Sequence, residues 1–284
     1  MDFSYSEEQL ALQDSLRRYL DKQYTLDERR RFVASDDGFS RDAWRTYAEL
    51  GLLALPFPEA LGGLGGNAVD TSLAMQTLGA ALALEPYVPT VIVCGALLRT
   101  AASAAQQDAL TGAVAEGRLR LALAHHEPGV RYALAQVETL AQPDGEHWRI
   151  DGRKALVLGG VSADKLLVSA RAAEGVSLFL VDRATAGVSL KPRSLHDGSR
   201  AADLQLDGVQ VEADALVGPI GGALAHIEHA IDHGTTALCA EAVGIMLALN
   251  DATLEYLKTR KQFGVAIGSF QALQHRMADL LLEI

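Results

Sequence analysis

The chain is short of cysteine, of positive charge and of long apolar runs. Its two cysteines, Cys94 and Cys239, exclude a disulfide scaffold and favour a reducing compartment. Its 25 lysines and arginines face 36 aspartates and glutamates, which leaves a net charge of −11. Because a nucleic-acid binder needs clustered positive charge to neutralise phosphates, we expect no nucleic-acid partner. The apolar run that comes closest to a membrane span, residues 88–98, is shorter than the roughly 20 residues required, so we expect no span.

The remaining composition is that of an ordinary globular protein, with 49% hydrophobic and 21% charged residues. A length of 284 residues leaves room for one large domain or for two or three smaller ones. Residues 1–10 are acidic, which is unlike a secretory or mitochondrial leader. We therefore expect a cytoplasmic protein.

Residues 1–116 read as a helical domain. Ser6 followed by Gln9 is a capping-box pattern, and a second helix is expected from Ser40 to Gly51. Two further helices are predicted over 71–84 and 88–116. The four glycines between residues 62 and 66 form a loop, and their spacing does not match the phosphate loop of a dinucleotide-binding fold.

Residues 117–220 change to the period of β-strands. Short apolar or alternating runs occur at 119–126, 135–141, 147–150, 155–158, 166–170, 176–181 and 204–211. The pair Asp151-Gly152 between two of these runs predicts a tight turn. Because no helices intervene, we expect a middle domain that is an antiparallel β-barrel or sandwich.

Residues 221–284 return to helix. A long apolar pattern runs from Ile227 to Leu257, and a further helix starts near Ser269. That last helix ends with an apolar face that nothing else in the chain covers. We expect either that a substantial C-terminal part follows or that another subunit buries this face. The predicted fold class is therefore α+β multidomain, with a helical bundle, a β-domain and an incomplete second helical bundle.

The order of these blocks and several motifs resemble the acyl-CoA dehydrogenase family over essentially the whole chain. The most specific motif is Arg-Lys-Gln-Phe-Gly at 260–264, followed by Phe-Gln at 270–271 and Met-Ala-Asp at 277–279. Further similar segments are 49–66 (ELGLLALPFPEALGGLGG), 127–129 (EPG), 148–154 (WRIDGRK), 206–211 (LDGVQV) and 216–218 (LVG).

The resemblance implies an FAD-dependent oxidoreductase that removes two hydrogens from Cα and Cβ of an acyl-CoA thioester. In such enzymes a carboxylate takes the α-proton and flavin N5 accepts the hydride, while the protein supplies orientation and electrostatics. The resemblance also implies a dimer or tetramer, of one chain or of two different chains. An electron-transfer flavoprotein or a similar acceptor would reoxidise the flavin.

Three residues near the C-terminus match family positions that contact FAD. In relatives, the residues matching Arg260, Phe263 and Gln271 reach the diphosphate and adenosine of a neighbouring subunit's FAD. A guanidinium suits a phosphate, and an aromatic ring suits an apolar face. Taken without the family context, the same residues read as a helix-end arginine, a core phenylalanine and a surface glutamine.

The middle domain departs from the family pattern where the flavin ring would lie. His126 stands where relatives have threonine, Leu156 where they have a tryptophan beside the ring, and Leu158 where they have a hydroxyl residue beside N5. Arg131 and Tyr132 also replace the usual glycine-serine-aspartate. The resemblance therefore implies cofactor contacts at these positions with two side-chain interactions lost.

No residue is identified as the catalytic base. Some relatives place the base on the long helix, at the position of Gly234, next to an arginine that is Thr235 here; most place it in a later helix. Glu241 lies on a similar face of the predicted helix but is disfavoured as a base. Asp232 matches a position that approaches the CoA moiety, and we expect it to contact substrate.

Three other features are not expected to carry chemistry. The histidines at 226, 229 and 233 could present two ligands to a metal, but no third ligand accompanies them and we expect no metal site. Cys239 has no activating neighbour in the sequence and is expected to be a small core residue. Residues 28–31 are a short basic run, expected to be a solvated helix face.

Two hypotheses stay open. The chain is either a self-sufficient FAD-dependent acyl-CoA dehydrogenase or a non-catalytic, half-site subunit that completes a partner chain's FAD site in a heteromeric enzyme. Five departures from the family pattern favour the second hypothesis: His126, Leu156, Leu158, Gly234 and Thr235. Arg260, Phe263 and Gln271 are compatible with both.

Overall fold

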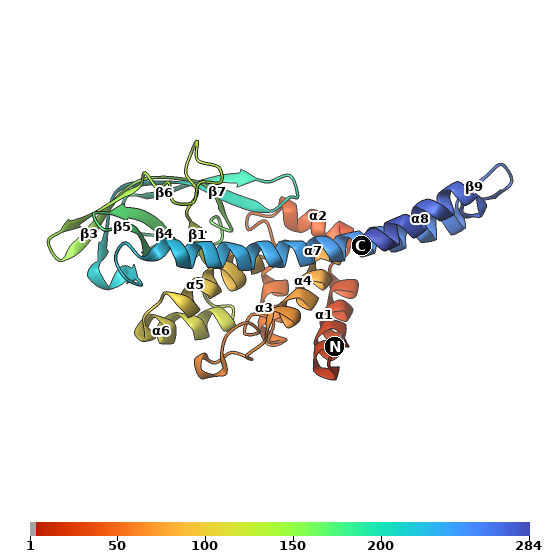
Figure 1. Ribbon diagram of the computed structural model, residues 1–284, viewed down its shortest axis with the longest axis horizontal. Helices are drawn as coiled ribbons and strands as arrows, with labels where there is room; N and C mark the ends of the chain where they lie inside the picture. Colours follow the sequence, from red (N-terminus) through yellow and green to blue (C-terminus); the bar gives the residue numbers. More distant parts are fainter. Residues whose placement is uncertain (1–3) are drawn as a thin grey trace.

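The computed structural model describes residues 4–284, so the first three residues of the acidic N-terminal segment lie outside the described part. One long helix, α7 (Ala223–Thr259), runs along much of the molecule, with the sheet on one side and several N-terminal helices on the other (Figure 1). The N-terminal helices are α1 (Glu7–Gln23), α2 (Leu26–Ala34), α3 (Arg41–Glu49), η1 (Glu59–Leu61), α4 (Ala68–Ala80), η2 (Val88–Cys94), α5 (Gly95–Thr100) and α6 (Ala104–Ala115). The predicted fold class is confirmed.

The helix starts follow local capping signals. The Ser6 hydroxyl accepts the Gln9 N–H and the Gln9 side chain accepts the Ser6 N–H, as the capping-box pattern predicts. Ser40 caps α3 as expected. The single helix predicted over 88–116 is wrong, because it is divided into the π-helix η2, α5 and α6. The break comes where Ser103 forms a second capping box with Gln106 and starts α6.

The middle domain is an eight-stranded sheet. Its strands are β1 (Leu121–Ala124), β2 (Leu140–Asp144), β3 (His147–Leu158), β4 (Lys165–Ala172), β5 (Gly175–Asp182), β6 (Val188–Ser194), β7 (Arg200–Glu212) and β8 (Leu216–Val217). The strand order is β6-β7-β3-β2-β4-β5-β8, with β1 also paired to β4. The pairs are antiparallel except that β1 and β2 run parallel to β4, so the sheet is mixed and not purely antiparallel as expected.

The turn predicted at Asp151-Gly152 is wrong. Both residues lie inside β3, where the pairing with β7 shifts register between Ile150 and Gly152. The Asp151 carboxylate accepts the Gly208 N–H at 2.6 Å, which ties the irregularity to β7. A side chain at Gly152 would meet Thr139 at 2.5 Å, so glycine is needed here for a close approach.

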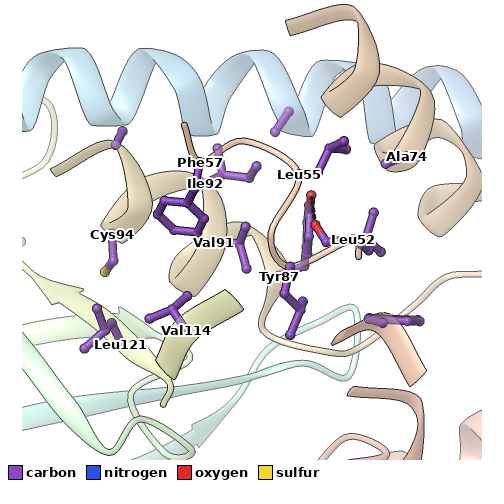
Figure 2. Close-up of a cluster of buried hydrophobic side chains, with 14 of the residues drawn as sticks. Leu52, Leu55, Phe57, Ala74, Tyr87, Val91, Ile92, Cys94, Val114 and Leu121 are labelled. Carbon is purple, nitrogen blue, oxygen red and sulfur yellow. Dashed lines mark hydrogen bonds between the residues drawn. The ribbon is translucent and has the colours of Figure 1, made fainter. Parts of the chain in front are cut away.

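Two hydrophobic clusters form the core. One joins the N-terminal helices to α7 and to the near side of the sheet; Figure 2 shows Phe57 next to Ile92, with Val114 and Leu121 toward the sheet. The other lies within the β-domain and includes Ile150. Cys94 is buried in the first cluster, but Cys239 is exposed on α7, so its expected place in the core is wrong.

Small residues let α7 lie against the N-terminal helices. The buried positions of α7 recur at helical spacing and are mostly small: Ala223, Ile227, Ala230, Gly234, Ala237, Ala240, Gly244 and Leu257. A Cβ on Gly244 would lie 1.9 Å from the carbonyl oxygen of Gln76 in α4, and one on Gly79 would lie 2.3 Å from that of Glu241. The backbones of α4 and α7 are therefore in direct contact.

Beyond α7 the chain forms a projecting hairpin and a last helix. The strands β9 (Lys261–Gln262) and β10 (Val265–Ala266) pair at the far end of the molecule. The 3₁₀ turn η4 (Ile267–Ser269) follows, and α8 (Gln271–Glu283) then runs back beside the end of α7 (Figure 1). The predicted long helix and the further helix near Ser269 are confirmed. Leu281 and Leu282 on α8 are exposed.

One helix bears on the expected absence of a membrane span. α7 is long and apolar enough to cross a membrane, by length and composition only. The segment contains no long uninterrupted apolar run, because histidines, threonines and Asp232 lie among its apolar residues. Its buried face packs against α4 and η2. Length and composition alone do not show that the helix crosses a membrane.

Candidate flavin and acyl-CoA site

The three residues expected beside the flavin ring lie together on and next to β3. The Ala155 N–H donates to the His126 carbonyl at 2.8 Å, which holds the exposed His126 beside the strand. Leu156 and Leu158 are 53% and 47% exposed. Leu156 has a positive φ of 51°, and its N–H donates to the Asp203 carboxylate at 3.3 Å. This part of β3 therefore offers an exposed apolar surface with few free polar groups.

A buried polar cluster lies directly behind this surface. The Lys154 ammonium is 2.7 Å from the Glu127 carboxylate, and both side chains are almost fully buried. Lys154 also donates to the Ser169 hydroxyl at 3.0 Å, and that hydroxyl lies 2.9 Å from Nδ1 of His125. Glu127 in turn accepts the N–H groups of residues 138 and 139. The cluster thus holds the segment after β1 against β3.

Burial sets the protonation of this cluster. It lowers the pKa of Lys154 to about 8, against the raising effect of the Glu127 hydrogen bond. It also lowers the pKa of His125 to about 4, with the positive charge of Lys154 acting in the same direction. For Glu127, burial raises the pKa, but the hydrogen bonds from Lys154 and Thr139 outweigh it and hold the pKa below its usual value. The sequence identifies Glu127 and Lys154 only as members of two family-like segments. It does not predict the ion pair between them, because they lie 27 positions apart in the chain.

The His125 environment predicts acid sensitivity. An unfolded histidine binds a proton near pH 6.5, whereas the folded His125 binds one only near pH 4. Acidification from pH 7 to pH 5 therefore favours the unfolded chain and should remove about 2 kcal/mol of stability through this residue. Urea unfolding at the two pH values measures this loss. In His125→Gln the difference between the two pH values should be smaller by that amount; an unchanged difference would contradict the assignment.

A cavity of 310 Å³ lies between the N-terminal helices, the sheet and α7. Leu158 lines it from β3, and Leu238 and Glu241 line it from α7. Burial, with the nearby Asp197 charge, raises the pKa of Glu241. Glu85 also lines the cavity, but its carboxylate is already bonded to the Tyr24 and Tyr47 hydroxyls at 3.3 and 3.1 Å. The cavity therefore joins one expected cofactor residue to Glu241, the carboxyl that was disfavoured as a base.

The other three expected cofactor residues lie together at the far tip. Arg260 ends α7, Phe263 is 90% exposed in the hairpin, and Gln271 opens α8. The Phe263 ring contacts the Phe270 ring edge-on at 6.2 Å. Arg260 lies nineteen positions after Glu241, which is about 28 Å along the axis of α7. The structure therefore brings Arg260, Phe263 and Gln271 together but keeps them apart from Leu156 and Leu158 of the same chain.

The remaining candidates lie on the middle of α7. Asp232 is exposed, as contact with a bound substrate requires, and its carbonyl accepts the Thr236 hydroxyl at 2.9 Å. Gly234 is buried, and a Cβ there would lie 2.9 Å from the Val93 side chain. The Thr235 hydroxyl bonds the carbonyl of residue 231 and carries no charge. The middle of α7 thus supplies neither the base nor the arginine that some relatives have there.

Of the three histidines on this helix, two form a pair. His229 and His233 have their Nε2 atoms 3.1 Å apart. Within residues 4–284, no group of three or more histidine, cysteine, aspartate or glutamate side chains is placed to hold a metal ion. The two rings form a hydrogen bond with each other.

Family models match nearly all of the chain. The N-terminal, middle and C-terminal domain models of acyl-CoA dehydrogenases match residues 6–118, 122–209 and 223–284. The chain belongs to the acyl-CoA dehydrogenase family. It is similar to acyl-CoA dehydrogenase FadE12 of Mycobacterium tuberculosis, with 29% identity over 99% of this chain and 74% of FadE12.

Two solved structures are also similar. One is described as the Tcur3481-Tcur3483 steroid ACAD G363A variant. It is 34% identical to this chain, with a TM-score of 0.85, and the match covers 98% of this chain and 74% of the chain in that structure. The other is the ChsE4-ChsE5 complex from Mycobacterium tuberculosis, 29% identical with a TM-score of 0.85 and the same two coverages. Membership of the acyl-CoA dehydrogenase family identifies the protein as an oxidoreductase that acts on acyl-CoA.

Acyl-CoA dehydrogenases are FAD flavoproteins, and the two groups of residues fit FAD unequally. The tip presents an exposed guanidinium, an exposed aromatic ring and an exposed amide, which suit a diphosphate and an adenosine. On β3 the exposed leucines suit an apolar ring face. The Leu156 N–H is engaged by Asp203, and the side chains of Leu156 and Leu158 provide no hydrogen-bond donor for the polar edge of a flavin.

Proposed function

We propose that this acyl-CoA dehydrogenase chain works beside a different, homologous chain in one FAD-dependent enzyme. Arg260, Phe263 and Gln271 would complete an FAD site whose flavin ring is held by the partner. The observation that carries the proposal is that Leu156 and Leu158, exposed where the flavin ring is expected, offer no side-chain hydrogen-bond donor to it. Two relatives described by paired chain names support the same arrangement.

In this arrangement each part of the chain has a separate task. Arg260 would bind the diphosphate through its guanidinium, while Phe263 would cover an apolar face of the adenosine. When bound, FAD supplies the hydride acceptor for α,β-dehydrogenation of the acyl-CoA. The base would come from the partner or from residues that follow position 284, because the position of Gly234 carries no carboxylate. We further propose an electron-transfer flavoprotein or a similar protein as the electron acceptor; the cytoplasmic location stays a prediction.

Flavin content of the chain alone and of the pair tests the proposal. Expressed alone, the chain should be colourless; co-expressed with a homologous partner chain, it should purify as a yellow complex. That complex should bleach when an acyl-CoA is added, and a steroid-derived acyl-CoA is the first to try because one relative is described as a steroid ACAD. A yellow chain that bleaches on its own would overturn the half-site proposal and favour the self-sufficient enzyme.

Substitution of Arg260 tests the cofactor contact. In the two-chain complex, Arg260→Gln should weaken FAD binding about 10- to 100-fold, because a charge-assisted bond to phosphate contributes roughly 1.5–3 kcal/mol. Equilibrium titration of the apo-complex with FAD measures the change. Arg276→Gln on the exposed face of α8 is the matched control and should leave FAD affinity unchanged. Equal effects of the two substitutions would contradict the assigned contact.

A further inference from the structure

A second, smaller cavity lies on another part of α7. It measures 200 Å³ and is enclosed by the start of α4, by η2 and α5, and by the middle of α7. Arg99 and His233 line it together with the polar side chains of Asn67, Thr71, Ser72 and Thr236. None of the residues named for the flavin or for the 310 Å³ cavity lines it.

Arg99 is the only charged residue among those that line this cavity, apart from the titratable His233. Its Nη1 atom is buried and has no hydrogen-bond partner among residues 4–284. The guanidinium lies over the Phe57 ring at 5.7 Å, and burial lowers the pKa of Arg99. Since buried guanidinium donors are normally paired with acceptors, this group lacks the anion that its charge and geometry favour.

Nothing else at the cavity supplies that anion. No aspartate or glutamate lines it. The Ser72 and Thr236 hydroxyls donate to carbonyl groups of their own helices, and neither accepts a hydrogen bond from the buried Nη1 atom of Arg99. Nε2 of His233 is engaged by His229, and burial, the neighbouring His229 and the Arg99 charge lower the pKa of His233, so its ring stays neutral at pH 7. One fixed positive charge therefore faces the cavity.

The size and walls of the cavity restrict its ligand. A water molecule occupies about 30 Å³ in the liquid, so the cavity of 200 Å³ has the volume of about seven water molecules. This size suits a ligand of a few heavy atoms. Ile92 and Ala237 add apolar wall to the polar side chains. A guanidinium can bind either a carboxylate or a phosphate through two parallel hydrogen bonds, but the single positive charge of Arg99 balances the one charge of a carboxylate and not the two of a phosphate dianion.

We propose that this cavity is a binding site for the carboxylate of a small organic acid, held by Arg99 between α4 and α7. The site lies within one chain and does not depend on the two-chain arrangement. Residues of α7 near Gly234 line this cavity, and residues further along α7 line the 310 Å³ cavity. A ligand bound at Arg99 would therefore stabilise the position of α7 at both cavities.

Binding of propionate tests the proposal. Calorimetric titration of the purified protein, or of the complex in which it is stable, should show saturable binding at constant ionic strength. Propionamide, the neutral isostere, should bind at least tenfold more weakly. Arg99→Gln should weaken propionate binding at least tenfold, while Arg45→Gln on the exposed face of α3 should change it less than twofold.

Three results would overturn the site. They are an absence of saturable binding to the wild-type protein, equal binding of propionate and propionamide, and an Arg99→Gln variant that binds propionate as the wild type does. The comparison of the two ligands uses only wild-type protein, so it decides the question even where the Arg99 variant folds poorly.

Discussion

Replacing Lys154 with methionine should lower the free energy of unfolding by about 3–5 kcal/mol. Methionine fills most of the space of the lysine stem but leaves the Glu127 carboxylate buried without its cation, and removing one member of a buried ion pair costs that much. The Lys154 and Glu127 side chains are 0% and 4% exposed, and their charged atoms are 2.7 Å apart. Urea unfolding at pH 7 measures the loss.

The double variant Lys154→Met/Glu127→Leu separates the pair from its surroundings. With both charges removed, no buried charge is left unpaired, so the double variant should lose much less stability than the sum of the two single variants. Lys258→Met serves as the control, because its pair with Glu255 is exposed and contributes less than about 1 kcal/mol. Additive single losses, or a Lys154 loss no larger than that of the control, would show that the pair does not stabilise the fold.

The same pair fixes the surface expected to face the flavin. Glu127 follows His126 in the chain and Lys154 precedes Ala155, whose N–H donates to the His126 carbonyl. The ion pair and this backbone bond therefore join the same two segments. Loss of Lys154 should displace His126 and the strand that carries Leu156 together.

The sequence predicted what depends on neighbouring residues along the chain. Capping at Ser6 and Ser40 needs only side chains within three positions, and both caps are present. The grouping of Arg260 with Phe263 and Gln271 also follows from short spacing, because a tight hairpin joins α7 to α8.

What the sequence could not predict depends on distant partners. Asp151-Gly152 continues β3 because β7 pairs on both sides of it and Gly208 binds the Asp151 carboxylate. β6 carries Lys191, Pro192 and Arg193, so it shows no apolar run and is a strand only through its pairing with β7.

Replacing Gly244 with alanine should cost about 2 kcal/mol of stability. The added methyl carbon would lie 1.9 Å from the Gln76 carbonyl oxygen, which belongs to the backbone of α4 and cannot rotate away. Overpacking at such a contact typically costs 1–3 kcal/mol and sometimes more, and the gain in helix propensity, at most about 1 kcal/mol, offsets only part of it. Thermal and urea unfolding should both show the loss.

Gly112→Ala on α6 is the matched control, because a Cβ there meets nothing within 4 Å and should stabilise the helix by up to about 1 kcal/mol. Gly79→Ala, which meets the Glu241 carbonyl at 2.3 Å, should destabilise the same interface. Once one methyl group has forced α4 and α7 apart, the second costs less, so the double variant should lose less than the sum of the single losses. A Gly244→Ala variant as stable as Gly112→Ala would mean that the backbones of α4 and α7 are not in contact at this position.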